Sequence, residues 1–259
     1  MSYVVKLGGH ALDSLEATSP VLAALASDLA QLTANSLVVH GGGPQIAELL
    51  ERVGRPSVFH EGLRVTDDAT MEYVAMALAH VNVHLVASLS NCGLRCVGLS
   101  GADAGMLRAQ PVGGYWGRIS SSPKVDTEVI AALWAEHLTP IISPLAVDDG
   151  GELVNCNADV AAGALAGALD AKVLVLLSDV DQLLADPQDP ESALRSVSRE
   201  DVRAMLASGA AREGMRPKMM AALEAIDAGA RRVLLANGTR PHALRDALAG
   251  AVATTEVFA

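Results

Sequence analysis

The sequence predicts an α/β fold built on a largely parallel sheet. Residues 4–7 form a short apolar run that ends at a pair of glycines, and residues 12–32 then show the apolar spacing of a helix. A second apolar run, residues 36–39, leads into three consecutive glycines at 41–43, and a helical pattern follows through residue 53. Two successive strand–turn–helix units imply parallel strands joined by right-handed crossovers.

The rest of the chain continues to alternate apolar runs with helical patterns. We expect helices over 69–90, 159–169, 199–207 and 214–228, and strands within 93–105, 139–145, 172–177, 231–236 and 252–258. A glycine- and serine-rich segment, residues 111–125, is expected to form a hairpin or flap. The strand–helix pattern restarts near Ala171, which we take as the boundary between two lobes.

The composition excludes several classes of function. The net charge is −11 and aromatic residues make up only 3% of the chain, so there is neither a basic surface nor a stacking platform for nucleic acid. No apolar run reaches the roughly 18 residues that a membrane helix needs, and no secretory signal opens the chain. We therefore expect a cytoplasmic protein without nucleic-acid or membrane partners. Cys92, Cys96 and Cys156 lack zinc-ligand spacing and are expected to be reduced thiols.

The glycine turns point to an anion site. A helix that begins directly after glycines presents free backbone N–H groups and a partial positive charge to a ligand. Ligands of parallel sheets bind beyond the carboxyl ends of the strands, where both turns would lie. Lys6, in the first apolar run, would be costly to bury without an anion. The alternatives are a tight turn of purely structural use and a structural salt bridge for Lys6.

Three further charged residues are candidates for the same site. Arg64 lies in a polar loop, and its planar guanidinium suits a carboxylate, although loop arginines are often only solvated. Asp159 lies at the expected start of a helix, where a carboxylate also stabilises the helix dipole by about 0.3–1 kcal/mol. Lys218 lies in a first helical turn, where a cation is unfavourable unless an anionic ligand binds there.

Six motifs in order resemble those of the amino acid kinase superfamily and, within it, of the bacterial N-acetylglutamate kinases. They are Lys6-Leu7-Gly8-Gly9, Val39-His40-Gly41-Gly42-Gly43, Gly62-Leu63-Arg64-Val65-Thr66, Asn155-Cys156-Asn157-Ala158-Asp159, Leu177-Ser178-Asp179-Val180 and Gly214-Met215-Arg216-Pro217-Lys218. The resemblance runs from about Val4 to the C-terminus. The chain contains no GxxxxGK[ST] loop, so phosphates would be held by a different arrangement of glycines and lysines.

The resemblance implies a three-layer αβα sandwich with two lobes. Residues 1–170 would bind the acyl amino acid and form a homodimer, and residues 171–259 would bind ATP. The implied reaction transfers the γ-phosphoryl group of ATP, with Mg²⁺, to the side-chain carboxylate of N-acetyl-L-glutamate in arginine biosynthesis. A carboxylate acceptor is already ionised near neutral pH, so the reaction needs no general base. It needs two anions brought into line and their charge neutralised.

The resemblance also implies a role for each site residue. Lys6 and Lys218 would flank the transferring phosphoryl group, and Asp159 would hold the two lysines in place. Gly42, Gly43, Arg64 and Asn155 would bind the acyl amino acid. The nucleotide and its phosphates would be contacted by Gly8, Gly9, Asp179, Val180, Asp181, Gln182, Leu183 and Leu184. No residue set is expected to form a metal site of its own.

The chain departs from the family pattern at three places. Val83 follows Asn82 where many relatives carry a lysine, so any role of that lysine is absent. The flap contains Gly117-Arg118-Ile119-Ser120 in place of the usual Gly-x-Val-Gly, which bears on the choice of substrate. The chain begins at the first strand, whereas arginine-inhibited members have an additional N-terminal helix that builds a hexamer. We therefore expect an arginine-insensitive homodimer.

Other functions remain open at this level. A related kinase could act on aminoadipate or glutamate, N-acetylated or carried on a small acidic protein, as in lysine biosynthesis. Such enzymes have a more basic surface around the entrance to the substrate site, whereas this chain has a net charge of −11 and few lysines. Other acceptors of the superfamily are aspartate, carbamate, uridylate and isopentenyl phosphate. A non-catalytic amino acid sensor on the same fold would not need Lys6, Lys218 and Asp159 together.

Overall fold

The computed structural model describes residues 2–8, 12, 18–60, 63–186, 188–208 and 215–259, and its centre is one eight-stranded sheet. In spatial order the strands are β14 (Ser196–Ser198), β16 (Thr254–Phe258), β15 (Arg232–Asn237), β11 (Val173–Ser178), β1 (Ser2–Leu7), β2 (Asn35–His40), β8 (Thr139–Ser143) and β5 (Cys96–Ser100). All neighbours from β15 to β5 are parallel. Only the pairing of β16 with β15 is antiparallel within this sheet.

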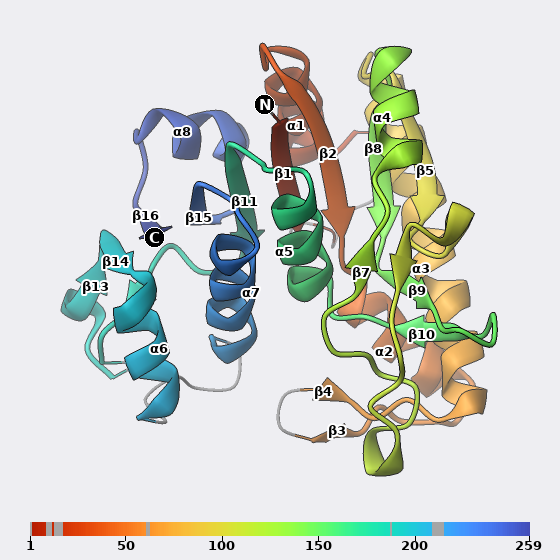
Figure 1. The fold of residues 1–259 in the computed structure, drawn as a ribbon. Helices are drawn as coiled ribbons and strands as arrows, with labels where there is room; N and C mark the ends of the chain where they lie inside the picture. Colours follow the sequence, from red (N-terminus) through yellow and green to blue (C-terminus); the bar gives the residue numbers. More distant parts are fainter. Residues whose placement is uncertain (1, 9–11, 13–17, 61–62, 187, 209–214) are drawn as a thin grey trace.

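Helices cover both faces of the sheet, which confirms the expected αβα sandwich (Figure 1). On one face lie α1 (Pro20–Ala30), α3 (Asp68–Asn91) and α8 (Ala243–Ala249). On the other lie α4 (Glu128–Ala135), α5 (Ala158–Ala168) and α7 (Arg216–Asp227), with α6 (Arg199–Ala207) packed against α7.

The alternation of side chains along β1 decides where its one lysine points. Successive residues of a strand face opposite sides of the sheet. Val5 and Leu7 pack in the core under α1 and α3, whereas Val4 packs in the core under α5. Lys6 shares the side of Val4 and therefore faces α5, the helix that carries Asp159.

Smaller sheets surround the carboxyl edge of the main sheet. A four-stranded sheet consists of β10 (Leu153–Asn155), β9 (Leu145–Val147), β6 (Leu107–Arg108) and β7 (Lys124–Val125). The hairpin of β3 (Phe59–His60) and β4 (Leu63–Arg64) lies beside α2 (Gly43–Arg52) and the flap, residues 111–125 (Figure 1). A further two-stranded ribbon pairs β12 (Leu183–Leu184) with β13 (Ala193–Leu194).

Most expected elements are present, with four differences. The helix expected over 12–32 begins at Pro20, because the Ser19 hydroxyl accepts a hydrogen bond from the Leu22 N–H and caps it there; residues 13–17 lie outside the described part. The strand expected over 139–145 divides into β8 and β9 at Pro144. Helices α4 and α8 were not predicted. The sheet continues across the expected lobe boundary, since β11 pairs with β1.

One helix in the described part of the chain, α3, has the length and composition of a membrane-spanning helix. Of its most apolar window, 44% is buried inside the fold. Its inner side packs against the sheet through residues such as Val81, Leu85 and Leu89, which is the position of a core helix.

Candidate active site

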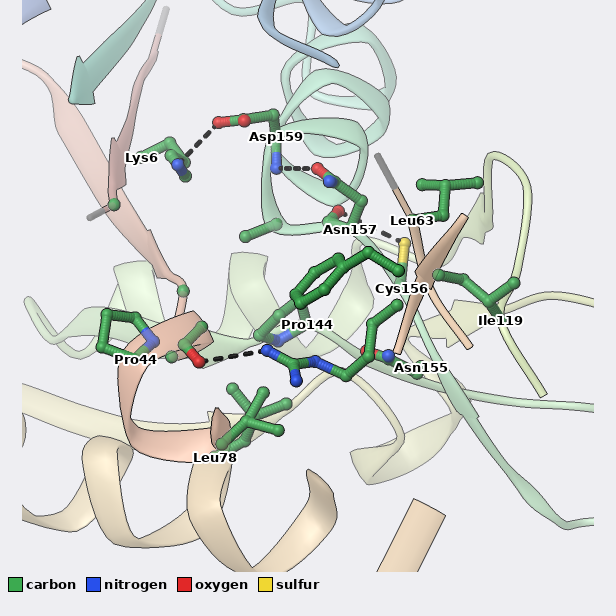
Figure 2. Close-up of a pocket in the computed structure, with 18 residues that line it drawn as sticks. Lys6, Pro44, Leu63, Leu78, Ile119, Pro144, Asn155, Cys156, Asn157 and Asp159 are labelled. Carbon is green, nitrogen blue, oxygen red and sulfur yellow. Dashed lines mark hydrogen bonds and ion pairs between the residues drawn. The ribbon is translucent and has the colours of Figure 1, made fainter. Parts of the chain in front are cut away.

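A cavity of about 270 Å³ opens at the carboxyl edge of the main sheet (Figure 2). The ends of β11, β1 and β2 are tied together there, because the Gly8 N–H donates to the Leu177 carbonyl at 3.1 Å and the Gly41 N–H donates to the Leu7 carbonyl at 2.8 Å. The cavity is lined by Lys6, Gly8, Gly41, Gly42, Gly43, Pro44, Ile46, Phe59, Leu63, Arg64, Leu78, Ile119, Pro144, Asn155, Cys156, Asn157, Ala158 and Asp159. Seven of the predicted site residues are therefore in one place: Lys6, Gly8, Gly42, Gly43, Arg64, Asn155 and Asp159.

Lys6 and Asp159 form a buried ion pair at the inner end of the cavity. The Lys6 Nζ lies 2.7 Å from the Asp159 Oδ1, and the two side chains are 8% and 9% exposed. Apart from this ion pair, the Asp159 Oδ1 has no hydrogen-bond partner among the described residues. The structural salt bridge weighed from the sequence thus exists, and it lies on the cavity wall.

Gly8 leaves room for the Lys6 side chain. A Cβ atom built at Gly8 would lie only 2.0 Å from the Lys6 Nζ, whereas the nearest backbone atom, the Leu177 carbonyl oxygen, would be 3.7 Å away. The ammonium group thus folds back over the turn and occupies the space that a side chain at residue 8 would take.

Two helices point their N-termini at the cavity. Helix α2 begins at the glycine turn, with Gly42 as its N-cap and no side-chain cap. Helix α5 begins at Ala158, where the Asn157 Oδ1 accepts hydrogen bonds from the backbone N–H groups of Asp159 and Val160. Each N-terminus contributes about half a positive charge, which favours an anionic ligand between them.

The glycine turn after β2 is held from behind by a buried histidine. His40 is fully buried, and burial lowers its pKa to about 4, so its imidazole is neutral at physiological pH. Its Nδ1–H donates to the Gly41 carbonyl at 2.8 Å, and its Nε2 accepts from the Asn82 amide at 3.0 Å. The Asn82 amide also donates to the Ile141 carbonyl at 2.9 Å. Asn82 therefore has a structural role in this network.

Arg64 is buried on the opposite wall of the cavity. It is 7% exposed, and burial lowers its pKa to about 10, a value at which the guanidinium remains charged at neutral pH. It donates to the Ser57 hydroxyl and, at 3.1 Å, to the Gly43 carbonyl, and it lies over the Phe59 ring at 4.7 Å. Within the described ranges no acidic side chain lies within ion-pair distance of Arg64. A buried cation of this kind requires an anionic partner.

The flap connects Asn155 to the hairpin. The Asn155 N–H donates to the Arg118 carbonyl at 2.8 Å, and the Asn155 carbonyl accepts from the Ser120 N–H at 2.9 Å. Arg118, at the variable position of the Gly-x-Val-Gly pattern, pairs with Asp148 at 2.7 Å. Its side chain therefore anchors the flap to the loop that follows β9.

The apolar part of the cavity could not be predicted from the sequence. This wall consists of Ile46, Phe59, Leu63, Leu78, Ile119 and Pro144. These residues lie on five separate segments of the chain, and short strands such as β3 and β4 leave no periodic pattern. The wall gives the cavity an apolar surface that includes the Phe59 ring, over which the Arg64 guanidinium lies.

Lys218 lies outside this cavity, in the first turn of α7. Helices α5 and α7 run parallel and in close contact, because Gly163 faces the Ala221 carbonyl and Gly167 faces Ala228. A Cβ atom at Gly163 would be 2.9 Å from that carbonyl oxygen. This register brings the first turn of α7, which carries Lys218, level with the first turn of α5, which carries Asp159.

The segment expected to contact the nucleotide follows β11 at the same edge of the sheet. Asp179 and Asp181 are exposed, whereas Leu183 is fully buried and its N–H donates to the Thr255 hydroxyl at 2.8 Å. The Gln182 amide donates to the Thr254 carbonyl at 3.0 Å. Val180 and Leu184 are half-buried. Gly9, the other residue expected at the phosphates, lies outside the described residues.

Cys156 lines the cavity but is 2% exposed, and burial raises its pKa to about 12. Its thiol is therefore protonated and unreactive at neutral pH. In the part of the chain that the structure describes, no group of three or more histidine, cysteine, aspartate or glutamate side chains could hold a metal ion.

Comparison with known proteins agrees with this geometry. Residues 1–237 match the amino acid kinase family. The chain is 40% identical over 257 residues to an acetylglutamate kinase of Symbiobacterium thermophilum, covering 93% of this chain and 85% of that one. It is 40% identical over 242 residues to an acetylglutamate kinase of Methanopyrus kandleri, covering 90% and 94%. The crystal structure of smu.665 from Streptococcus mutans superposes with a TM-score of 0.80 at 28% identity, covering 91% and 94%. The chain belongs to the amino acid kinase family.

Proposed function

We propose that this protein transfers the γ-phosphoryl group of ATP to the side-chain carboxylate of N-acetyl-L-glutamate. The observation that carries the proposal is the charge of the cavity. In a chain of net charge −11, the cavity brings together Lys6, Arg64 and two helix N-termini, and Asp159 is the one carboxylate among the described residues that line it. A site with this excess of positive charge suits a ligand with several negative charges. The relatives named above are acetylglutamate kinases.

The shape of the cavity fits the acceptor. Among the described residues, Arg64 donates one hydrogen bond to the Ser57 hydroxyl and one to the Gly43 carbonyl, which leaves three of its five N–H groups for an α-carboxylate. The apolar wall suits the methyl and methylene groups of an N-acetylated amino acid. At about 270 Å³ the cavity is below the roughly 300–1,000 Å³ typical of sites for drug-sized ligands, so a small acceptor is expected.

The reaction needs neutralised charge and alignment. An oxygen of the acceptor carboxylate forms a bond to the γ-phosphorus while the bond from that phosphorus to the β,γ-bridging oxygen breaks, and ADP leaves with the electron pair. No proton moves. In the proposed arrangement Lys6 stabilises the transferring phosphoryl group from the side of β1, and the N–H groups of the glycine turns bind its oxygens and the acceptor carboxylate.

Asp159 and Lys218 complete the arrangement. Two lysines directed at one phosphoryl group repel each other, and a carboxylate between them offsets that repulsion. Asp159 already pairs with Lys6. The first turns of α5 and α7 lie level with each other, which supports the same role of Asp159 towards Lys218. Mg²⁺ would enter with the nucleotide and neutralise its phosphate oxygens. We assign ATP to the lobe of residues 171–259, with the segment 179–184 at the nucleotide, and the acyl amino acid to residues 1–170.

We also propose that the protein acts in the cytoplasm as an arginine-insensitive homodimer.

Steady-state ADP release with a panel of acceptors tests the function. The panel contains N-acetyl-L-glutamate, L-glutamate, L-aspartate, N-acetyl-aminoadipate and uridylate. We expect turnover with N-acetyl-L-glutamate alone, and a higher kcat/KM for another acceptor would overturn the assignment. Light scattering and activity with added L-arginine test the assembly, and a hexamer or inhibition would contradict it.

A further inference from the structure

We propose that Thr66 is a positioning residue that fixes the direction of the Asn155 side-chain amide, so that Asn155 presents its oxygen to an N–H group of the acceptor. The inference rests on the proposed function and concerns how that site selects an N-acylated acceptor. Thr66 does not line the cavity and is fully buried, yet its hydroxyl forms hydrogen bonds with two of the residues assigned to the acyl amino acid, Arg64 and Asn155.

The hydrogen bonds of Thr66 determine its role. The Thr66 hydroxyl donates its one hydrogen to the Arg64 carbonyl at 2.9 Å. The hydroxyl can therefore act towards Asn155 only as an acceptor, and it receives the Nδ2–H of Asn155 at 3.1 Å. The amide nitrogen of Asn155 thus points to Thr66, and its Oδ1 points elsewhere.

The hairpin explains why the Thr66 hydrogen stays on Arg64. The Val65 N–H donates to the Val58 carbonyl across the hairpin, which makes the neighbouring pair, Phe59 and Arg64, a non-hydrogen-bonded pair. The Arg64 carbonyl therefore has no backbone donor from β3. Turning the Asn155 amide over would require the Thr66 hydrogen to leave this buried carbonyl, which would cost a hydrogen bond.

The backbone around Thr66 holds the hydroxyl in place. The Thr66 N–H donates to the Trp116 carbonyl at 3.1 Å, and the Thr66 carbonyl accepts from the Arg118 N–H at 2.7 Å. The chain passes so close at this point that a Cβ atom at Gly117, where φ is +65°, would lie 2.3 Å from the Thr66 carbonyl oxygen. Thr66 is thus fixed by the flap on one side and by the hairpin on the other.

The Asn155 Oδ1 is left for a ligand. Asn155 lines the cavity, and among the residues that the structure describes none donates a hydrogen bond to this oxygen. An acceptor atom in the same cavity as the Arg64 guanidinium suits a molecule that carries an N–H next to its α-carboxylate. An N-acyl amino acid has that arrangement, and an ester in place of the amide does not.

The test combines one substrate analogue with two variants. The analogue is 2-acetoxyglutarate, in which an ester oxygen replaces the amide N–H of N-acetyl-L-glutamate. In the wild-type enzyme we expect kcat/KM for the analogue to be lower by at least about tenfold, the scale of an acceptor left unpaired in a closed site. In Thr66→Val the amide of Asn155 can rotate, so KM for N-acetyl-L-glutamate should rise by about tenfold while KM for ATP stays unchanged. The ratio of kcat/KM between the two acceptors should fall towards one.

Thr66→Ser is the matched control, since it retains the hydroxyl and should retain both the KM and the discrimination. A purely structural role of Thr66 would lower the melting temperature without changing the ratio between the two acceptors. Equal kcat/KM for both acceptors in the wild-type enzyme, a measurement that needs no variant, would overturn the inference. So would undiminished discrimination in Thr66→Val. Absence of both binding and turnover of N-acetyl-L-glutamate by the wild-type enzyme would instead overturn the proposed function, and this inference with it.

Discussion

The ion pair between Lys6 and Asp159 gives a quantitative prediction for the empty enzyme. Both side chains are less than a tenth exposed, and their charged atoms are 2.7 Å apart. Removing one partner of a buried pair leaves the other charge uncompensated and typically costs about 3–5 kcal/mol. Asp159→Asn, which leaves Lys6 buried without a counter-ion, should therefore lower the free energy of unfolding by about that amount. At about 2–4 °C per kcal/mol, the melting temperature should fall by roughly 6–20 °C.

Lys6→Met should cost less than Asp159→Asn. The carboxylate that it leaves behind lies in the first turn of α5, where the helix dipole offsets roughly 0.3–1 kcal/mol. The double variant contains neither charge, so its loss of stability should be smaller than the sum of the two single losses. The difference, the coupling energy of the cycle, should be at least about 2 kcal/mol.

The assay is urea unfolding followed by circular dichroism, without nucleotide or phosphate in the buffer. The exposed pair of Glu48 and Arg52 on α2 is the matched control, with side chains 62% and 71% exposed. Its coupling energy should be about 0.3–0.5 kcal/mol. A Lys6–Asp159 coupling no larger than that of the control would refute the reasoning, because the buried pair would then not hold the lysine in place.

Three further predictions concern catalysis and pH. Gly8→Ala places a Cβ atom 2.0 Å from the Lys6 Nζ and displaces the ammonium group from Asp159, so kcat should fall by up to about 10²-fold and the melting temperature should fall as well, and unchanged kcat would contradict the proposed position of Lys6. Lys218→Ala should lower kcat by about 10²–10³-fold, the scale of losing one charge that stabilises the transition state, and near-normal turnover would refute its role. Burial raises the pKa of Glu224 to about 7, so the folded protein holds this proton between pH 4.5 and 7 more tightly than the unfolded chain does. The stability contributed by protonated Glu224 is lost as the pH rises through 7. Glu224→Gln should therefore raise the free energy of unfolding by about 1–2 kcal/mol at pH 8 and change it little at pH 4.5. Urea unfolding at the two pH values measures both effects.

The charged part of the site could be expected from the sequence because it depends on local signals. Lys6 lies in an apolar strand before a glycine pair, where a cation needs an anionic partner. Asp159 lies at the start of a helix, beside two asparagines. The parallel sheet then brings both to its carboxyl edge. The first helix was expected to begin at residue 12 because the apolar pattern extends back that far, whereas α1 begins at Pro20. Ser19-Pro20 is the signature of a helix N-terminus.

The rest of the site depends on contacts between distant segments. Phe59, Leu63 and Ile119 are ordinary apolar residues until the hairpin and the flap fold over the cavity. Thr66 belongs to one of the six motifs, but its role depends on the direction of two hydrogen bonds that only the structure shows. Neither periodicity nor composition carries that information.

The formation of an acyl phosphate is the most direct test of the proposed function. The enzyme would be incubated with ATP, Mg²⁺ and each acceptor of the panel in the presence of hydroxylamine, which converts an acyl phosphate into a stable hydroxamate. We predict ATP-dependent hydroxamate with N-acetyl-L-glutamate, at a rate equal to that of ADP release, and its loss in Lys6→Ala. ADP release without hydroxamate, or hydroxamate with a different acceptor, would contradict the assignment of this cavity to the carboxylate of N-acetyl-L-glutamate.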